Sequence, residues 1–408
     1  MSQLKPNPKQ SDPFYYGVAI VTVYLAGLLQ GLTMVSFPAS STILKHLHGF
    51  TDAQYGSIFI PEVLFTILGA FSGSYLTDKI GLKYVLWIAL LANALSQIAL
   101  GGSYFLSPER SFICILTGTG LMGLGFGLSA APINTLPQRF FSHPTETAVV
   151  AMHTFLGSGL ALGPLVLGWW FNTTSTWLGF PVVLLIVSML LLGLTLLGHF
   201  PAQQISKKLP EKLSTIIHSP VFWLFMLIGV LYAFAEGTLS NWAVIYLSDD
   251  RHLPLSVASM ALAGFWGALA MGRLIISAII VRVDAYKVWL VLPLLILSAF
   301  LLLPYVHTSI SGIGLFVWAG FACSAFFPLT VGLVSDEFPD QVAWVSSMTI
   351  VAVMFGVGLG SFIIGPLHSL MPFAMLYRLS AFYPAAALVL VLIVLKKIHH
   401  HFRKANIC

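Results

Sequence analysis

Charged side chains are scarce in this chain of 408 residues: Asp, Glu, Lys and Arg make up 8% of it, and hydrophobic residues 58%. Soluble domains carry about 25% charged residues, so the composition excludes a water-soluble protein and predicts an integral membrane protein. Cysteine is also rare. Cys114, Cys323 and Cys408 are far apart and form no Cys-x-x-Cys pair, so we expect no metal site and no cofactor.

Several motifs of other protein classes are absent or lack the right context. There is no Gly-Lys dipeptide, which excludes a P-loop and an ATP-driven pump built on it. The stretch Gly118–Gly123 matches Gly-x-Gly-x-x-Gly, but it lies inside an apolar run, so no dinucleotide site is expected. The polar start MSQLKPNPKQSDP lacks a small-residue cleavage site, so the first apolar run should remain in the mature protein.

Long apolar runs are abundant. A membrane helix needs roughly 20 apolar residues, and cutting the sequence at Pro, Gly and charge clusters predicts twelve such helices. They are expected at 15–38, 54–76, 81–102, 111–139, 145–170, 177–199, 219–248, 255–282, 286–305, 310–337, 341–370 and 372–396. The predicted fold is therefore an all-α membrane protein, with an N-terminal six-helix bundle (1–200), a cytoplasmic linker (201–217) and a C-terminal six-helix bundle (218–408).

The positions of Lys and Arg predict the orientation of the chain. With the N-terminus inside, only Lys45, Arg110 and Arg251 fall in outer loops, and most of the 19 basic residues fall in cytoplasmic segments. The positive-inside rule therefore places both termini in the cytoplasm. The same bias accounts for the net charge of +5, so a nucleic-acid partner is not expected.

The two sets of six predicted helices repeat each other. GFGLSAAP (Gly125–Pro132) recurs as GFACSAFFP (Gly320–Pro328), and GSGLALGPL (Gly157–Leu165) recurs as GVGLGSFIIGPL (Gly356–Leu367). The matches occur in the same order in both halves. Parallel six-helix repeats are typical of carriers whose halves rock around a central binding site.

A charged loop, SYLTDKIGLKYV (Ser74–Val85), separates the second and third predicted helices. It resembles the loop signature of the major facilitator superfamily, with Ser74 at a position where the family usually has Gly. In that family the Asp meets the N-terminal end of the eleventh helix and nearby basic residues, and so closes the cytoplasmic gate. The resemblance implies gating roles for Asp78, Lys79, Gly81, Lys83, Arg139 and Arg273; the alternative is a loop that only sets topology.

Two further resemblances concern the fourth and fifth predicted helices. GLGFGLSAAPINTLPQRFF and AMHTFLGSGLALGPL are similar to the fucose-galactose-glucose:proton symporter branch, which implies binding roles for Asn134 and His153. The acidic positions of that branch align with Met34 and Ala130, so its sugar substrate does not follow. GLALGPLVLG also partly matches the signature of drug:proton antiporters, which leaves the direction of transport open.

A charged residue inside a span is a candidate functional residue, because its insertion into the membrane costs about 2.5–3.5 kcal/mol on insertion scales. Of the acids, only Glu62 and Glu236 lie well inside predicted helices. We expect Glu236, near the middle of the seventh helix, to take up and release a proton because burial disfavours its charged form. Glu62 is the second coupling candidate. A structural hydrogen bond to a neighbouring helix is the alternative for both.

Other polar and aromatic side chains at mid-membrane depth are candidates for binding a solute. Each of them could instead serve helix packing. The predicted substrate-binding set is Gln30, Thr33, Asn134, His153, Asn241, Trp242 and Trp266.

Together these features predict a secondary transporter that moves a small organic solute by alternating access. Proton-coupled uptake by a monomer in the plasma membrane, the inner membrane of a bacterium, is the favoured interpretation. The alternatives are a drug-type proton antiporter and a non-transporting membrane sensor. An enzyme is not expected, because no His, Asp and Glu cluster inside the spans has acid-base or metal spacing.

Overall fold

The computed structural model describes residues 13–141, 145–174, 176–201 and 216–405. Most of the predicted linker 201–217, several of the basic residues used for orientation and Cys408 lie outside the described residues. The side chains of the histidine run 399–401 also lie outside them.

All described elements are helical, and twelve stretches in the described chain are long and apolar enough to cross a membrane. Both predictions, an all-α fold and twelve spans, are confirmed. Most boundaries agree within a few residues, but the first span extends to His48 and the helix of the seventh ends at Asn241. The helix is interrupted at Val35, but the next segment, SFPASSTILKHLH, is helical again. The first span is therefore longer than predicted.

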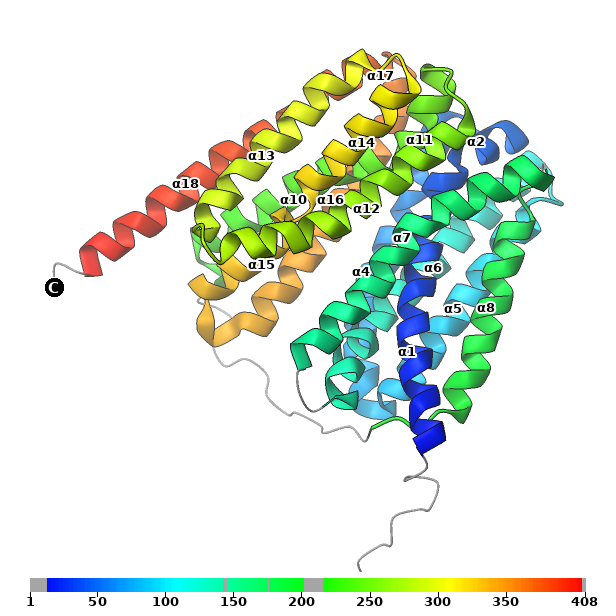
Figure 1. Cartoon of the computed structure of the whole chain (residues 1–408), viewed down its shortest axis with the longest axis horizontal. Helices are drawn as coiled ribbons and strands as arrows, with labels where there is room; N and C mark the ends of the chain where they lie inside the picture. Colours follow the sequence, from blue (N-terminus) through cyan, green and yellow to red (C-terminus); the bar gives the residue numbers. More distant parts are fainter. Residues whose placement is uncertain (1–12, 142–144, 175, 202–215, 406–408) are drawn as a thin grey trace, which may run out of the picture. The chain divides into compact units, whose positions relative to one another are not determined.

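Contacts divide the chain into two compact units. The first contains the described residues up to Ser36 and from Leu64 onward to the linker. Its helices, labelled in Figure 1, are α1 (Pro13–Met34), most of α4 (Phe59–Ile80), α5 (Leu82–Ser103), α6 (Pro108–Phe140), α7 (Thr145–Thr174) and α8 (Gly179–Leu197).

The second unit combines residues Phe37–Val63 with the described residues after the linker. It holds α2 (Ser36–His48) from Phe37 onward, α3 (Asp52–Ser57) and the first turn of α4. From the second half of the chain come α10 (Pro220–Asn241), α11 (Ala243–Ile245), the π-turn η2 (Tyr246–Asp250), α12 (Leu255–Ile280), α13 (Ala285–Leu302), η3 (Leu303–Tyr305), α14 (Ser309–Cys323), α15 (Phe326–Glu337), η4 (Pro339–Gln341), α16 (Val342–His368), α17 (Phe373–Ser380) and α18 (Phe382–Ala405). The bundle boundaries predicted from the repeat remain a prediction.

The repeated glycine motifs serve the same helix crossing in each unit. A Cβ added to Gly159 on α7 would lie 2.2 Å from the carbonyl oxygen of Leu28 on α1. One added to Gly360 on α16 would lie 2.8 Å from the Cα of Phe234 on α10. Since real side chains do not approach backbone this closely, only glycine lets these helices cross, as small residues do in membrane bundles.

The tenth span is broken in its middle, between Cys323 at the end of α14 and Phe326 at the start of α15. Pro328 explains the break, because it has no backbone N–H to bond the carbonyl of Ser324 four residues earlier. The equivalent Pro132 lies inside an unbroken α6. The second unit therefore has a helix break that its repeat in the first unit lacks.

Candidate functional site

Glu236 lies on α10, and as a residue it is half-buried. It makes a side-chain hydrogen bond with Tyr232, one helical turn earlier, and it interacts electrostatically with Arg273 of α12. Tyr232 is almost completely buried, at 2% exposure, whereas Arg273 is exposed. The structure therefore brings together two predicted residues, Glu236 and Arg273, and adds Tyr232 as a third.

The same two partners of Glu236 also bind the break in the tenth span. The Tyr232 hydroxyl donates a hydrogen bond of 3.0 Å to the carbonyl oxygen of Cys323. Arg273 Nε donates one of 3.1 Å to the carbonyl oxygen of Ser324. These carbonyls need outside donors, because the last turn of a helix has no partners of its own and Pro328 supplies none.

The ring of Tyr232 contacts the other side of the break. It stacks on Phe326, the first residue of α15, at a centroid distance of 5.2 Å. Phe326 in turn stacks on Trp289 of α13, which stacks on Phe225 of α10. Tyr232 thus touches the end of α14 with its hydroxyl and the start of α15 with its ring.

Asn241 and Trp242 lie where α10 ends and packs against α16. The side-chain amide of Asn241 donates to Ser361 Oγ at 2.7 Å, and Trp242 Nε1 donates to the Ser361 carbonyl at 2.9 Å. Tyr55 of α3 donates to the Asn241 carbonyl at 2.9 Å and meets the Trp242 ring edge-on. Both predicted binding residues are thus buried in helix packing, and the regular helix of the seventh span is interrupted at Trp242.

Glu62 and Trp266, the other predicted residues of the second unit, are both half-buried. Glu62 lies in the first turn of α4, close enough to Tyr55 for an electrostatic interaction. Trp266 lies on α12, edge-on to Phe265 at a centroid distance of 5.2 Å. The two acids predicted inside the membrane are therefore in the same unit.

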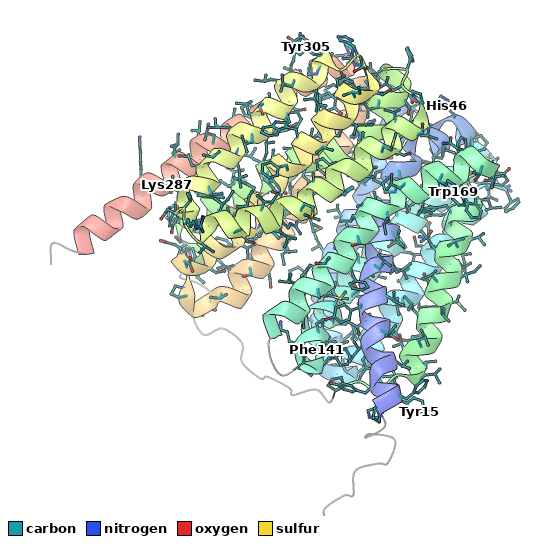
Figure 2. The ribbon with its side chains drawn as sticks, in the orientation of Figure 1. Tyr15, His46, Phe141, Trp169, Lys287 and Tyr305 are labelled. Atoms are coloured by element: carbon teal, nitrogen blue, oxygen red, sulfur yellow. The ribbon has the colours of Figure 1, made fainter. Side chains whose placement is uncertain are left out.

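An ionic cluster that the sequence did not reveal ties α2 and α3 to the rest of the second unit. Asp52 pairs with Lys45 and accepts a 2.7 Å contact from His368 Nδ1 at the end of α16. Lys45 also lies 3.4 Å from a carboxylate oxygen of Asp249 in η2. His46, labelled in Figure 2, adds a further contact of 3.4 Å to Asp249 from an exposed ring.

In the first unit the structure brings Asn134 and His153 together. The Asn134 amide nitrogen donates to the Ala130 carbonyl at 2.8 Å, and its Oδ1 lies 3.0 Å from His153 Nε2. With the amide oriented this way, His153 must carry its hydrogen on Nε2. Both side chains are exposed, so this pair presents polar groups that a solute could contact.

Gln30 and Thr33 are instead fully buried within the first unit. Gln30 Nε2 lies 3.4 Å from the carbonyl of Gly125 on α6, and the Thr33 hydroxyl donates to the Gln30 carbonyl at 3.0 Å. In this conformation Gln30 joins α1 to α6, Thr33 bonds within α1, and neither is open to a solute.

The predicted gating loop follows α4. Gly81 has φ of 88°, a turn conformation that residues other than glycine rarely adopt. Lys83 Nζ donates at 3.0 Å to each of the carbonyls of Leu196 and Gly198, so it binds the C-terminal end of α8, where a cation is favourable. Lys79 lies over the Tyr75 ring. Asp78 is exposed and Arg139 half-buried.

The sequence analysis missed two features of the candidate site: a hydrogen-bond partner of Glu236 and a long-range ionic contact. Tyr232 could have been found, because residues four apart on a helix face each other. The contact between Asp52 and His368 could not, because 316 residues separate them in the chain.

Comparison with known proteins places this geometry in a family. The sequence pattern described as "Major Facilitator Superfamily" matches residues 21–343. A putative tartrate transporter of Agrobacterium vitis is 27% identical over 175 residues, 42% of this chain and 39% of that protein. The Saccharomyces cerevisiae protein named Bypass of stop codon protein 6 is 21% identical over 304 residues, 66% of this chain and 59% of that protein. The chain thus spans less than two thirds of either relative's length.

Solved structures support the same fold. A variant of the nucleoside transporter NupG superposes with a TM-score of 0.78 and 16% identity, covering 92% of this chain and 99% of that one. A bacterial homolog of the human lysosomal transporter Spinster, in an inward-facing and unoccupied conformation, gives a TM-score of 0.70 and 16% identity over 94% of this chain and 96% of that one. With a family pattern over most of its length and twelve candidate membrane spans in the described residues, the chain is a multi-pass membrane protein that belongs to the Major Facilitator Superfamily, a transporter family.

Proposed function

We propose that this transporter is a symporter that couples uptake of a small organic solute to protons. The observation that carries the proposal is the half-buried Glu236, which is hydrogen-bonded to Tyr232 and interacts electrostatically with Arg273 beside a helix break. An ionisable group at mid-membrane depth is expensive and marks a proton or substrate path. A helix break beside it supplies an element whose shape can change when the charge changes.

The coupling follows from differential stability of the two protonation states. Protonated Glu236 removes a negative charge from the spans, so the carrier can change conformation at a lower cost when the proton is bound. A higher proton concentration outside than in the cytoplasm then drives net uptake. Glu62, in the same unit, is the second coupling candidate.

For substrate binding we propose the exposed pair Asn134 and His153 of the first unit as polar contacts. Trp266 of the second unit is a separate candidate for stacking on a solute. The buried residues Gln30, Thr33, Asn241 and Trp242 would take part only in a conformation that exposes them. The names of the similar proteins suggest two solute classes to test, hydroxy dicarboxylates and nucleosides. The resemblance to the fucose-galactose-glucose:proton branch adds sugars as a third.

We also propose cytoplasmic termini, a location in the plasma membrane or bacterial inner membrane, and a monomeric state with bundles at 1–200 and 218–408. The observation behind the orientation is the bias of Lys and Arg in the sequence. Protease access to a C-terminal tag in right-side-out vesicles tests it, because cleavage from the outside would contradict this topology.

The loop after α4 is proposed as the cytoplasmic gate, with Asp78 as its central residue. Asp78→Asn should favour the inward-open state and slow transport, because it removes a charge whose interaction with a helix N-terminus contributes about 0.3–1 kcal/mol. Labelling of single cysteines from the cytoplasmic side measures the shift. Normal transport with unchanged labelling would show that the loop only sets topology.

Proton movement in proteoliposomes tests the proposed function directly. Nucleosides, tartrate, sugars, amino acids and drug-like cations are first screened by thermal shift, because a ligand that binds the folded state raises its stability. A stabilising solute is then added outside vesicles that contain a pH-sensitive dye. Acidification of the interior confirms symport. Alkalinisation would instead identify the antiporter, and solute entry without any pH change would exclude proton coupling.

A further inference from the structure

We propose that Tyr232 is the positioning residue that transmits the protonation state of Glu236 to the break in the tenth span. This inference rests on the proposed proton coupling and adds the moving element: the junction between α14 and α15. Three contacts define it, namely Tyr232 to Glu236, Tyr232 to the Cys323 carbonyl, and Arg273 to the Ser324 carbonyl.

The argument starts from the single hydrogen of a phenol. The Tyr232 hydroxyl donates that hydrogen to the Cys323 carbonyl at 3.0 Å, so it has none left for Glu236. A protonated Glu236 can complete this arrangement, because its O–H donates to the Tyr232 oxygen. The result is a chain of hydrogen bonds from Glu236 through Tyr232 to the end of α14, in which each hydroxyl hydrogen has an acceptor.

Loss of the proton reverses the direction of this chain. An ionised carboxylate only accepts hydrogen bonds, and a hydrogen bond to a charged acceptor is stronger than one to a carbonyl. The Tyr232 hydrogen therefore turns to Glu236, and the Cys323 carbonyl loses its donor. Arg273 is drawn toward the same carboxylate and away from the Ser324 carbonyl.

The junction is suited to respond because its backbone depends on these two outside donors. Neither the end of α14 nor Pro328 supplies a substitute. The ring of Tyr232 also stacks on Phe326, so a rotation of this side chain acts on α15 as well as on α14. We infer that the angle between α14 and α15 differs between the two protonation states.

Few other groups compete for this role. Among the described residues, the titratable or charged groups that face Glu236 are Tyr232 on its own helix, Arg273 from α12 and the thiol of Cys323 from α14. The helices α11, α15, α16 and α18, which also pack on α10, contribute no such group in the described part of the chain.

The test measures the bend of the tenth span as a function of pH. Spin labels are placed at Gly314→Cys on α14 and Gly332→Cys on α15, where an added Cβ meets nothing within 4 Å, in a full-length chain whose native cysteines are replaced. The labels would be roughly 27 Å apart on a straight helix. The parent should show a change in this distance as the pH is raised, when Glu236 loses its proton.

Three variants separate the possible causes. Glu236→Gln should remain at the acidic distance, because Gln can donate to Tyr232 as the protonated acid does. Tyr232→Phe, which keeps the ring, should lose the pH-dependent change and remain at the alkaline distance. Tyr24→Phe is the matched control, because its hydroxyl also donates to a helix carbonyl, that of Ala148 at 3.0 Å, in the other unit; it should respond as the parent does.

The outcomes are distinguishable. A Tyr232→Phe variant that responds to pH as the parent does overturns the inference and leaves the proposed proton site intact. A Glu236→Gln variant that still responds overturns the proton site itself. A parent with no pH-dependent distance, or a Tyr24→Phe control that also loses the response, contradicts a specific role for Tyr232.

Discussion

Replacement of Glu236 by Gln should abolish proton-driven accumulation of the substrate while counterflow exchange continues. Gln keeps the shape of the side chain and most of its hydrogen bonds, but it cannot release a proton. With one proton per solute, a gradient of about one pH unit supports roughly tenfold accumulation, because about 1.4 kcal/mol corresponds to a factor of ten. The variant should therefore equilibrate the solute to a ratio of about one. Uptake of labelled solute into proteoliposomes with an imposed pH gradient measures this.

Two controls make the result specific. Glu62→Gln removes the other acid predicted inside the membrane, which is also half-buried in the same unit, and it should keep accumulation if Glu236 is the coupling group. Thermal unfolding shows whether each variant remains folded. If Glu236→Gln accumulates solute with the external pH dependence of the parent, Glu236 is structural, and Glu62 or His153 becomes the coupling candidate.

The spans could be predicted because hydropathy alone determines them. An apolar run of membrane length has few stable arrangements other than a helix, because lipid offers no hydrogen-bond partners to backbone N–H and C=O groups. The turn at Gly81 was also readable, because a charged loop with one glycine between two apolar runs leaves few positions for the turn. The glycine repeats lie where helices cross, because small residues are needed where backbones meet.

The functional contacts were harder to predict because they join distant segments. Pro328 was visible in the repeat GFACSAFFP, but Pro132 stands at the equivalent place in an unbroken helix. The proline alone therefore does not decide whether a helix breaks. The donors that occupy the break, Tyr232 and Arg273, come from α10 and α12, and only the folded structure brings them there.

The grouping of residues 37–63 with the second unit was not predictable from the repeat. This segment continues at both ends into helices of the first unit. It is held in the second unit by the ionic cluster of Lys45, Asp52, Asp249 and His368.

Asp52→Asn should loosen this segment strongly. Asp52 makes two charged contacts, with Lys45 and with His368, and the side chains of Lys45 and Asp52 are only 14% and 19% exposed. Each hydrogen bond to a charged group contributes about 1.5–3 kcal/mol to stability, and an Asn at position 52 would retain part of this contribution. We expect amide hydrogen exchange in α2 and α3 to accelerate roughly 10- to 100-fold, because about 1.4 kcal/mol is a factor of ten.

Asp250→Asn is the matched control. Asp250 and Arg251 form an ion pair of 3.3 Å with similar exposure, 23% and 17%, but the two residues are neighbours in the chain. The Asp250→Asn variant loses one ion pair, but this pair does not hold α2 and α3 in place. Amide hydrogen exchange in those helices should therefore stay close to that of the parent. The comparison is made by mass spectrometry on the full chain in detergent. Equal exchange rates in the Asp52→Asn variant and the parent would mean that apolar packing, for example of Gly56 against the backbone of Phe362 and Gly365, holds the segment without help from the ionic cluster.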